Sequence, residues 1–170
     1  MSSEQKIVLV DYKMGNYHSV IRSLHRIGVE STISSDPEVI LSADKIILVG
    51  VGHFKKAMEN LQSFRLIDCL NEFALTQKKP VLGICLGMQL MAEYGEEGEC
   101  NGLGWVDGRV KKLKVSDNLN FKIPHTGWNQ IKHQKESPLM NKIENSTEFY
   151  FVHSYFYKTD DKDIILNTTN

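Results

Sequence analysis

A cysteine bracketed by two glycines lies near the middle of the chain, between a short apolar stretch and a helix-like run. Residues 83–87 read Gly-Ile-Cys-Leu-Gly; residues 80–82 before them are Pro-Val-Leu, and residues 88–92 after them have a helical pattern. Strand, sharp turn and helix in this order are typical of a nucleophile elbow. We expect glycine on both sides because a Cβ there would clash or forbid the required dihedral angles.

Cys85 would stand at the amino end of that helix, where backbone N–H groups and the helix dipole favour a thiolate. The alternative is a buried core cysteine, but the glycine bracket favours the nucleophile. Cys69 lies in a helical stretch and is expected in the core, whereas Cys100 is expected to be an exposed bystander. Three cysteines without CxxC spacing argue against a disulfide framework and against a metal site.

Length and charge narrow the class of protein. The 170 residues predict a single domain spanning 1–170, and 41% hydrophobic with 24% charged residues is ordinary for a globular protein. A net charge of -1 gives no support for nucleic acid or an anionic membrane as the main partner. Without an apolar signal core or spanning segment, a cytoplasmic protein is expected. Nothing in the sequence indicates a cofactor.

The first half alternates strand-like and helix-like segments. Continuous apolar strands in such an alternation predict an α/β fold, with an open, mostly parallel sheet covered by helices on both faces. The strand-like segments are residues 6–11, 30–34, 45–49 and 80–82; the helix-like segments are 16–27, a short helix beginning at 35–37, and 54–77 with a break near Ser63. Residues 11–16, residues 50–53 and the elbow follow three of these strands, so we expect them to converge at the carboxyl edge of the sheet.

The second half has a different texture, with clustered glycines and shorter alternating runs. Residues 109–115 alternate between lysine and apolar side chains, which predicts antiparallel strands and hairpins. Residues 124–129 are interpreted as a turn-rich segment. Residues 148–152 form an aromatic strand leading into His153, and residues 163–167 are expected to form a last short strand.

The glycine turn at residues 50–52 could present backbone N–H groups to a developing oxyanion. With Cys85 on a neighbouring strand, an oxyanion hole becomes the better interpretation, and the N–H of Leu86 would be its second donor. A cysteine nucleophile also needs a base, usually histidine. Of the six histidines, His18 and His25 are expected at the surface and His133 in solvent, leaving His53, His125 and His153 as candidates for substrate or interface contacts.

Several segments together resemble a known family. Residues 83–90 are similar to the elbow of class I, or triad-type, glutamine amidotransferases. Residues 124–129 (Pro-His-Thr-Gly-Trp-Asn) and 151–155 (Phe-Val-His-Ser-Tyr), with residues 11–16 and 50–54, resemble the glutaminase subunits of imidazole glycerol phosphate synthases. The resemblance runs along the whole chain and implies a flavodoxin-like, three-layer fold.

The resemblance also implies a reaction. Glutamine is hydrolysed to glutamate through a thioester on Cys85, and ammonia passes to a synthase subunit, a (β/α)8 barrel, in histidine biosynthesis. It implies a cytoplasmic heterodimer without a cofactor. The resemblance also implies a role for three groups of residues. The oxyanion hole would be formed by Val51, Gly52 and Leu86. Glutamine would be bound by Gln89, Glu97, Ser154 and Tyr155, and the partner subunit and the ammonia path would be faced by Asn16, Trp128 and Tyr150.

The sequence departs from the family pattern in four places. Lys13 stands at a usual glycine, Val49 at a proline and Thr126 at a common methionine; these changes alter loop stiffness or the interface. The family completes its triad with a His-Pro-Glu segment, which is absent from these 170 residues. We therefore expect the domain as given to lack its C-terminal end and to turn over poorly, since a general base contributes roughly 10²–10⁴-fold.

Three alternatives remain open. One is a truncated or non-catalytic paralogue that docks a synthase without turnover. Another is a subunit that supplies ammonia to an enzyme of amidino-modified surface sugars. A third, a different elbow hydrolase acting on a small amide or ester, is disfavoured by residues 124–129.

Overall fold

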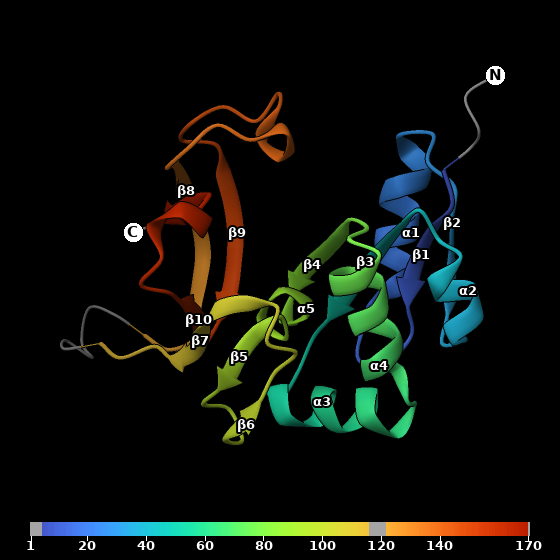
Figure 1. The fold of residues 1–170 in the computed structure, drawn as a ribbon. Coiled ribbons are helices and arrows are strands. Elements are labelled where there is room, and N and C mark those ends of the chain that lie inside the picture. The colour runs from blue at the N-terminus through green and yellow to red at the C-terminus, as the bar shows by residue number, and fades with distance from the viewer. Residues whose placement is uncertain (1–4, 116–121, 170) are drawn as a thin grey trace.

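The computed structural model describes residues 5–115 and 122–169. Its first sheet, among these residues, has four parallel strands in the order β2-β1-β3-β4 (Figure 1). The strands are β1 (Ile7–Val10), β2 (Ser31–Ser34), β3 (Lys45–Gly50) and β4 (Val81–Cys85). All four were predicted, and their order is that of flavodoxin-like sheets.

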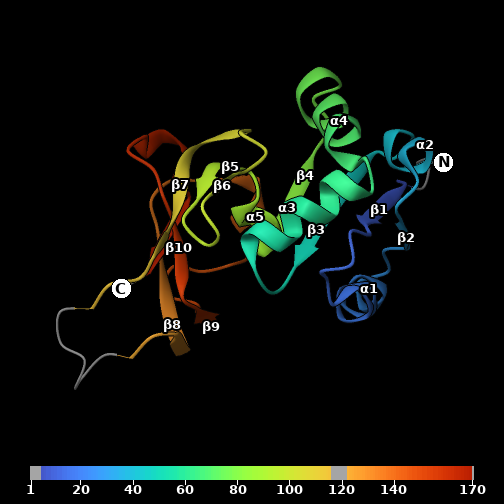
Figure 2. The same ribbon diagram turned by 90° about the horizontal axis from the view of Figure 1, so that it is seen from below.

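Helices cover both faces of this sheet, which confirms the expected three layers (Figure 2). Helix α1 (Tyr17–Arg26) covers one face, where it packs on Leu9, Ile47 and Val49. The opposite face carries α2 (Pro37–Leu41), α3 (Phe54–Ser63), α4 (Leu66–Asn71) and the π-helical turn η1 (Glu72–Thr76). Successive strand residues alternate between the two cores, which is why the strands are apolar throughout.

Local signals set the helix boundaries. Asp36 caps α2, since its carboxylate accepts a hydrogen bond from the N–H of Glu38 at 2.9 Å. Gly28 follows α1 with a φ of +74°, a conformation that favours glycine. The break predicted near Ser63 is confirmed, because α3 ends there and α4 begins at Leu66.

The second half forms two smaller sheets among the described residues, in the orders β10-β7-β5-β6 and β11-β8-β9. The first is mixed, because β5 and β7 run parallel, whereas the second is antiparallel. Their elements are β5 (Ala92–Gly95), β6 (Cys100–Asn101), β7 (Val106–Lys112), β8 (His125–His133), β9 (Glu148–His153), β10 (Tyr155–Lys158) and β11 (Asn167–Thr169), with short 3-10 turns η2 (Pro138–Met140) and η3 (Lys162–Ile164).

Three predictions of local structure were wrong. Residues 124–129 are largely strand, because residues 125–130 pair continuously with β9 and this ladder outweighs their turn-forming composition. Residues 163–167 do not form a strand: Asp161 caps the turn η3 with a 2.8 Å hydrogen bond, and β11 begins only at Asn167. The helix after the elbow is α5 (Leu86–Gln89), and Ala92 already belongs to β5.

Two single-residue predictions also need correction. Cys69 is buried as expected, but Cys100 is half-buried and packs against the main core rather than lying exposed. His133 is not fully solvated, because its Nε2 is buried and has no hydrogen-bond partner among the described residues.

No helix in residues 5–115 and 122–169 combines the length and apolar character needed to cross a membrane. The same ranges hold no cluster of His, Cys, Asp and Glu suited to a metal ion.

Candidate active site

Cys85 is the last residue of β4, and α5 begins at the next residue. Its side chain is exposed, and its backbone has φ +53° and ψ -117°. A positive φ in a residue with a side chain costs roughly 1–3 kcal/mol and persists only where the surroundings enforce it. The predicted strand, sharp turn and helix are therefore confirmed, with the strain on the cysteine itself.

The two bracketing glycines are required by crowding. A Cβ on Gly87 would overlap the carbonyl oxygen of Leu48 on the neighbouring strand. A Cβ on Gly83 would approach the backbone nitrogen of Met88 to 2.6 Å. The expected clash is confirmed at both positions. Neither glycine has a positive φ, so crowding rather than a special dihedral angle accounts for both.

The three segments expected at the carboxyl edge do meet. Gly50 and Cys85 are register partners at the ends of β3 and β4. The N–H of Val51 donates to the carbonyl oxygen of Met14 at 2.7 Å, which joins the loop after β3 to the loop after β1. Gly52 follows with a φ of +107°. In this conformation the Val51 N–H is occupied within the protein and is not offered to a ligand.

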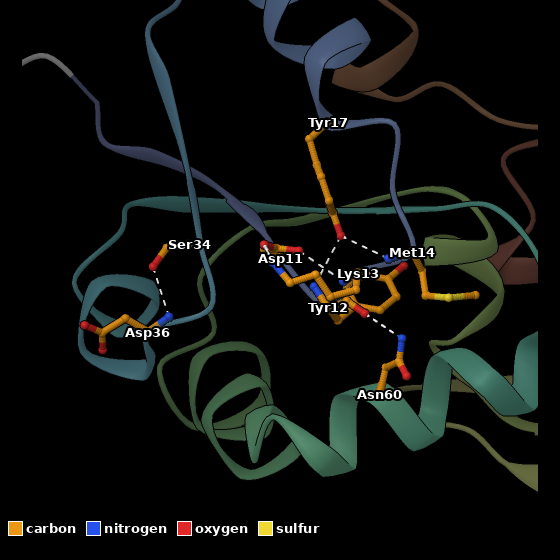
Figure 3. Close-up of polar contacts among 8 residues, drawn as sticks. All are labelled: Asp11, Tyr12, Lys13, Met14, Tyr17, Ser34, Asp36 and Asn60. Carbon is orange, nitrogen blue, oxygen red and sulfur yellow. Dashed lines mark hydrogen bonds and ion pairs between the residues drawn. The ribbon is translucent and has the colours of Figure 1, made fainter.

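The loop after β1 is held by a tyrosine of the following helix (Figure 3). The Tyr17 hydroxyl accepts hydrogen bonds from the backbone N–H groups of Tyr12 at 3.2 Å and Met14 at 3.3 Å. Asn60 of α3 donates its amide to the Tyr12 carbonyl at 2.9 Å. Sequence reasoning did not single out Tyr17 or Asn60, because these contacts join residues whose spacing forms no motif.

Lys13 occupies the position where the family resemblance has glycine. Its φ is +63°, a conformation in which glycine is favoured. Its ammonium pairs with Asp11 at 2.6 Å. Burial raises the pKa of Asp11, but the hydrogen bonds and charge of Lys13 outweigh burial and hold that pKa below its usual value. The ion pair therefore helps the loop to tolerate a non-glycine residue.

Tyr12 and Tyr17 make a matched pair for a stability prediction. Tyr12 is fully buried and its hydroxyl has no hydrogen-bond partner among the described residues, so burial raises its pKa. Tyr12→Phe is expected to leave the free energy of unfolding unchanged or to raise it by up to about 1 kcal/mol. Tyr17→Phe removes an acceptor of two N–H groups and is expected to lower it by about 2 kcal/mol. Urea unfolding of both variants measures the difference; equal losses would contradict this account of the loop.

Two of the residues implicated in glutamine binding are in contact. The Gln89 amide, on α5, donates to the carbonyl oxygen of Tyr155 at 3.3 Å. The Glu97 carboxylate accepts from the N–H of Phe54 at 2.8 Å and so caps α3. Burial raises the pKa of Tyr155, and the nearby charge of Glu97 raises it further. Ser154 precedes Tyr155, and its carbonyl accepts from the N–H of Leu113 at 2.8 Å.

The residues implicated at the partner face are only partly brought together. Trp128 and Tyr150 are register partners on β8 and β9, and their rings make an edge contact at 5.6 Å. They are 67% and 55% exposed, which is unusual for large aromatic side chains. Asn16 lies elsewhere, at the N-cap of α1, and its side chain does not cap the helix. No contact among the described residues connects Asn16 with the aromatic pair.

No histidine in the described part of the chain hydrogen-bonds to Cys85. His53 is the N-cap residue of α3, without a side-chain cap bond. His125 and His153 instead bond to one another at 3.0 Å across β8 and β9. A hollow of about 710 Å³ lies beside η2, and none of the predicted site residues lines it.

Comparison with known proteins shows to which family the chain belongs. The model of the family "Glutamine amidotransferase class-I" matches residues 8–170. Imidazole glycerol phosphate synthase subunit HisH 1 of Campylobacter jejuni is 48% identical over 157 residues, which are 92% of this chain and 77% of that protein. Subunit HisH of Pelagibacter ubique is 44% identical over 169 residues, covering 96% and 81%.

Solved structures agree on the fold. A putative GMP synthase protein from Thermoplasma acidophilum superposes with a TM-score of 0.71 at 17% identity, over 99% of this chain and 75% of that one. The PurLQS structure from Thermotoga maritima gives a TM-score of 0.67 at 16% identity, over 98% and 74%. With an exposed cysteine on a strained elbow and a family model that matches nearly the whole chain, this protein belongs to the class I glutamine amidotransferases, in their HisH branch.

Proposed function

We propose that this chain is the glutamine-hydrolysing subunit of an imidazole glycerol phosphate synthase and supplies ammonia for histidine biosynthesis. The observation that carries the proposal is the exposed Cys85 on its strained elbow, in a chain 42–48% identical to proteins named HisH. That name identifies the relatives as subunits of a two-component synthase.

The chemistry assigned to Cys85 is a two-step acyl transfer. Its sulfur attacks the side-chain carbonyl carbon of glutamine, a C–S bond forms, and the C–N bond breaks as the nitrogen takes up a proton and leaves as ammonia. Water then attacks the thioester, which releases glutamate and restores the thiol. The base is not assigned to any of the six histidines, because none in the described part of the chain hydrogen-bonds to the thiol.

Leu86 and Gly52 are the residues to which we assign stabilisation of the oxyanion. The N–H of Leu86 belongs to the first residue of α5, so it is one of the helix donors without an intrahelical acceptor. The Val51 peptide contributes only if it turns away from the Met14 carbonyl. A contribution from the Val51 N–H therefore requires breaking the 2.7 Å hydrogen bond between those two residues.

Gln89, Glu97, Ser154 and Tyr155 are proposed to hold the substrate. Glutamine carries an ammonium, a carboxylate and an amide, so it needs both acceptors and donors. The contact between Gln89 and Tyr155, with Glu97 close enough to affect the Tyr155 hydroxyl, supports a common pocket. Glu97 is the natural acceptor for the ammonium group.

Trp128 and Tyr150 are proposed to face the synthase subunit, a (β/α)8 barrel, with Asn16 beside the ammonia path. Exposed aromatic pairs are typical anchors of protein interfaces, where their truncation commonly costs about 2 kcal/mol or more in binding, roughly 30-fold in affinity. Trp128→Ala is therefore expected to weaken assembly with the synthase subunit by about 30-fold. Ile27→Ala, at the exposed end of α1, is the control and is expected to leave assembly unchanged. Titration calorimetry with the synthase subunit measures both; equal effects would contradict the assignment of the face.

Glutamate release from glutamine tests the proposed activity. The chain should be assayed alone and with its synthase subunit, and release is expected to depend on Cys85 and to increase in the complex. Tight assembly without any Cys85-dependent glutamate would favour a non-catalytic docking role. Ammonia delivery to a sugar-modifying partner in place of the imidazole-forming one would contradict the assignment to histidine biosynthesis.

A further inference from the structure

A row of hydrogen bonds runs from β8 through two histidine rings to the glutamine-binding residues. The Asn129 amide nitrogen lies 3.2 Å from Nε2 of His125. Nδ1 of His125 lies 3.0 Å from Nε2 of His153, and Nδ1 of His153 lies 2.8 Å from the carbonyl oxygen of Tyr155. The same carbonyl accepts the amide of Gln89 at 3.3 Å. The row thus connects four elements: β8, β9, β10 and α5.

The Tyr155 carbonyl at one end and the Asn129 amide nitrogen at the other set the directions of the bonds in the row. A carbonyl oxygen only accepts, so Nδ1 of His153 carries the proton and its Nε2, in the neutral ring, is the acceptor. Nδ1 of His125 must then donate, which leaves Nε2 of His125 to accept from Asn129. With the Asn129 amide nitrogen facing His125, each ring in this arrangement carries its donor proton on Nδ1.

The two rings are also held in place by packing. His125 stacks on Phe151 with centroids 5.3 Å apart and planes inclined by 20°. His125 and His153 meet edge to face at 5.1 Å. Residues on this side of the strands are half-buried, so solvent competes little for the bonds.

The row of hydrogen bonds lies between the paired strands β8 and β9 and the residues proposed to bind glutamine. Side chains alternate between the two faces of a strand, so His125 and His153 lie behind the face that carries Trp128 and Tyr150. At the other end, Tyr155 holds Gln89, which lies on α5, the helix that begins directly after Cys85.

We propose that His125 and His153 are positioning residues for glutamine: by holding the Tyr155 peptide they orient Gln89, and they couple this contact to the face of the β8–β9 ribbon that carries Trp128 and Tyr150. This inference rests on the proposed function of the site. It assigns neither histidine to the chemical step, because neither hydrogen-bonds to Cys85.

Asparagine and glutamine distinguish the two nitrogens of an imidazole. The asparagine amide reaches the place of Nδ1, whereas the glutamine amide reaches the place of Nε2. His153→Asn therefore keeps a donor for the Tyr155 carbonyl, and His153→Gln removes it. His125→Asn keeps the donor toward His153, and His125→Gln removes it. Each pair compares substitutions of similar polarity at one position.

The decisive measurement is glutamine binding to the chain carrying Cys85→Ala, in complex with its synthase subunit, by calorimetry. His153→Gln is expected to raise the Kd about tenfold, as for the loss of one partly buried hydrogen bond, and His153→Asn by less than about threefold. His125→Gln should weaken binding less than His153→Gln, and the double Gln variant no more than His153→Gln alone, because both act through one row.

Kinetics in the Cys85 background supply the second readout. His153→Gln should raise KM for glutamine while kcat changes little, and His153→Asn should restore KM. Equal behaviour of the Asn and Gln variants, or a fall in kcat at constant KM, overturns the inference while leaving the glutaminase proposal intact. Failure of the Cys85→Ala parent to bind glutamine overturns the proposed function itself, and the inference with it.

Discussion

Replacing Cys85 by alanine is expected to lower glutamate release by a factor of about 10⁴ or more, since removal of a nucleophile eliminates the covalent route. Glutamine binding should survive, because the side chains assigned to the substrate lie on α5, β10 and the segments beside β5 and β9. The rate of glutamate formation and the Kd for glutamine, measured on the same preparation, separate the two effects.

Cys100→Ala is the matched control. Cys100 is half-buried, burial raises the pKa of its thiol, and it packs against the core rather than at the elbow. The Cys100 variant should therefore retain glutamate release and still react with iodoacetamide at Cys85. Substantial glutamate formation by the Cys85 variant would exclude the thioester route.

Gly87→Ala is expected to lower the free energy of unfolding by about 3 kcal/mol or more. The new Cβ would overlap the carbonyl oxygen of Leu48, a backbone atom of the central strand β3 that cannot move without disturbing the sheet. The elbow should be lost together with stability, so glutamate release should fall as well. Urea unfolding followed by circular dichroism measures the change.

Gly28→Ala is the control for the general cost of replacing glycine. Unlike Gly87, Gly28 has a positive φ of +74°, but a Cβ there would meet nothing within 4 Å. Its loss should be limited to the backbone strain of about 1–2 kcal/mol. Equal destabilisation by the two alanines would mean that close packing of β3 against α5 does not explain the glycine at position 87.

The parallel half of the fold could be predicted because its signals are local. Apolar strands, a capping Asp36 and a terminating Gly28 each act within a few residues. The glycine bracket around Cys85 also predicted the crowding correctly. The short length of α5 could not be predicted in this way, because pairing of Ala92 with Val106 ends the helical run through a residue distant in sequence.

In the candidate site, too, features set by local sequence and topology could be predicted, whereas contacts between residues distant in sequence could not. Convergence of the loops after β1, β3 and β4 follows from parallel topology and was predicted. The contact of Gln89 with Tyr155 joins residues 66 positions apart, and only the family resemblance placed both at the substrate. The histidine row could not be predicted, because the composition of residues 124–129 favours a turn; their pairing with β9 brings the two rings together.

The measurement that most directly tests the central claim is mass spectrometry of the chain, in complex with its synthase subunit, quenched in acid during glutamine turnover. A glutamyl adduct is expected on the peptide that contains Cys85; it should be labile to base and absent from the Cys85→Ala variant. Glutamate accumulating while Cys85 stays unmodified, or an adduct on another residue, would contradict that claim.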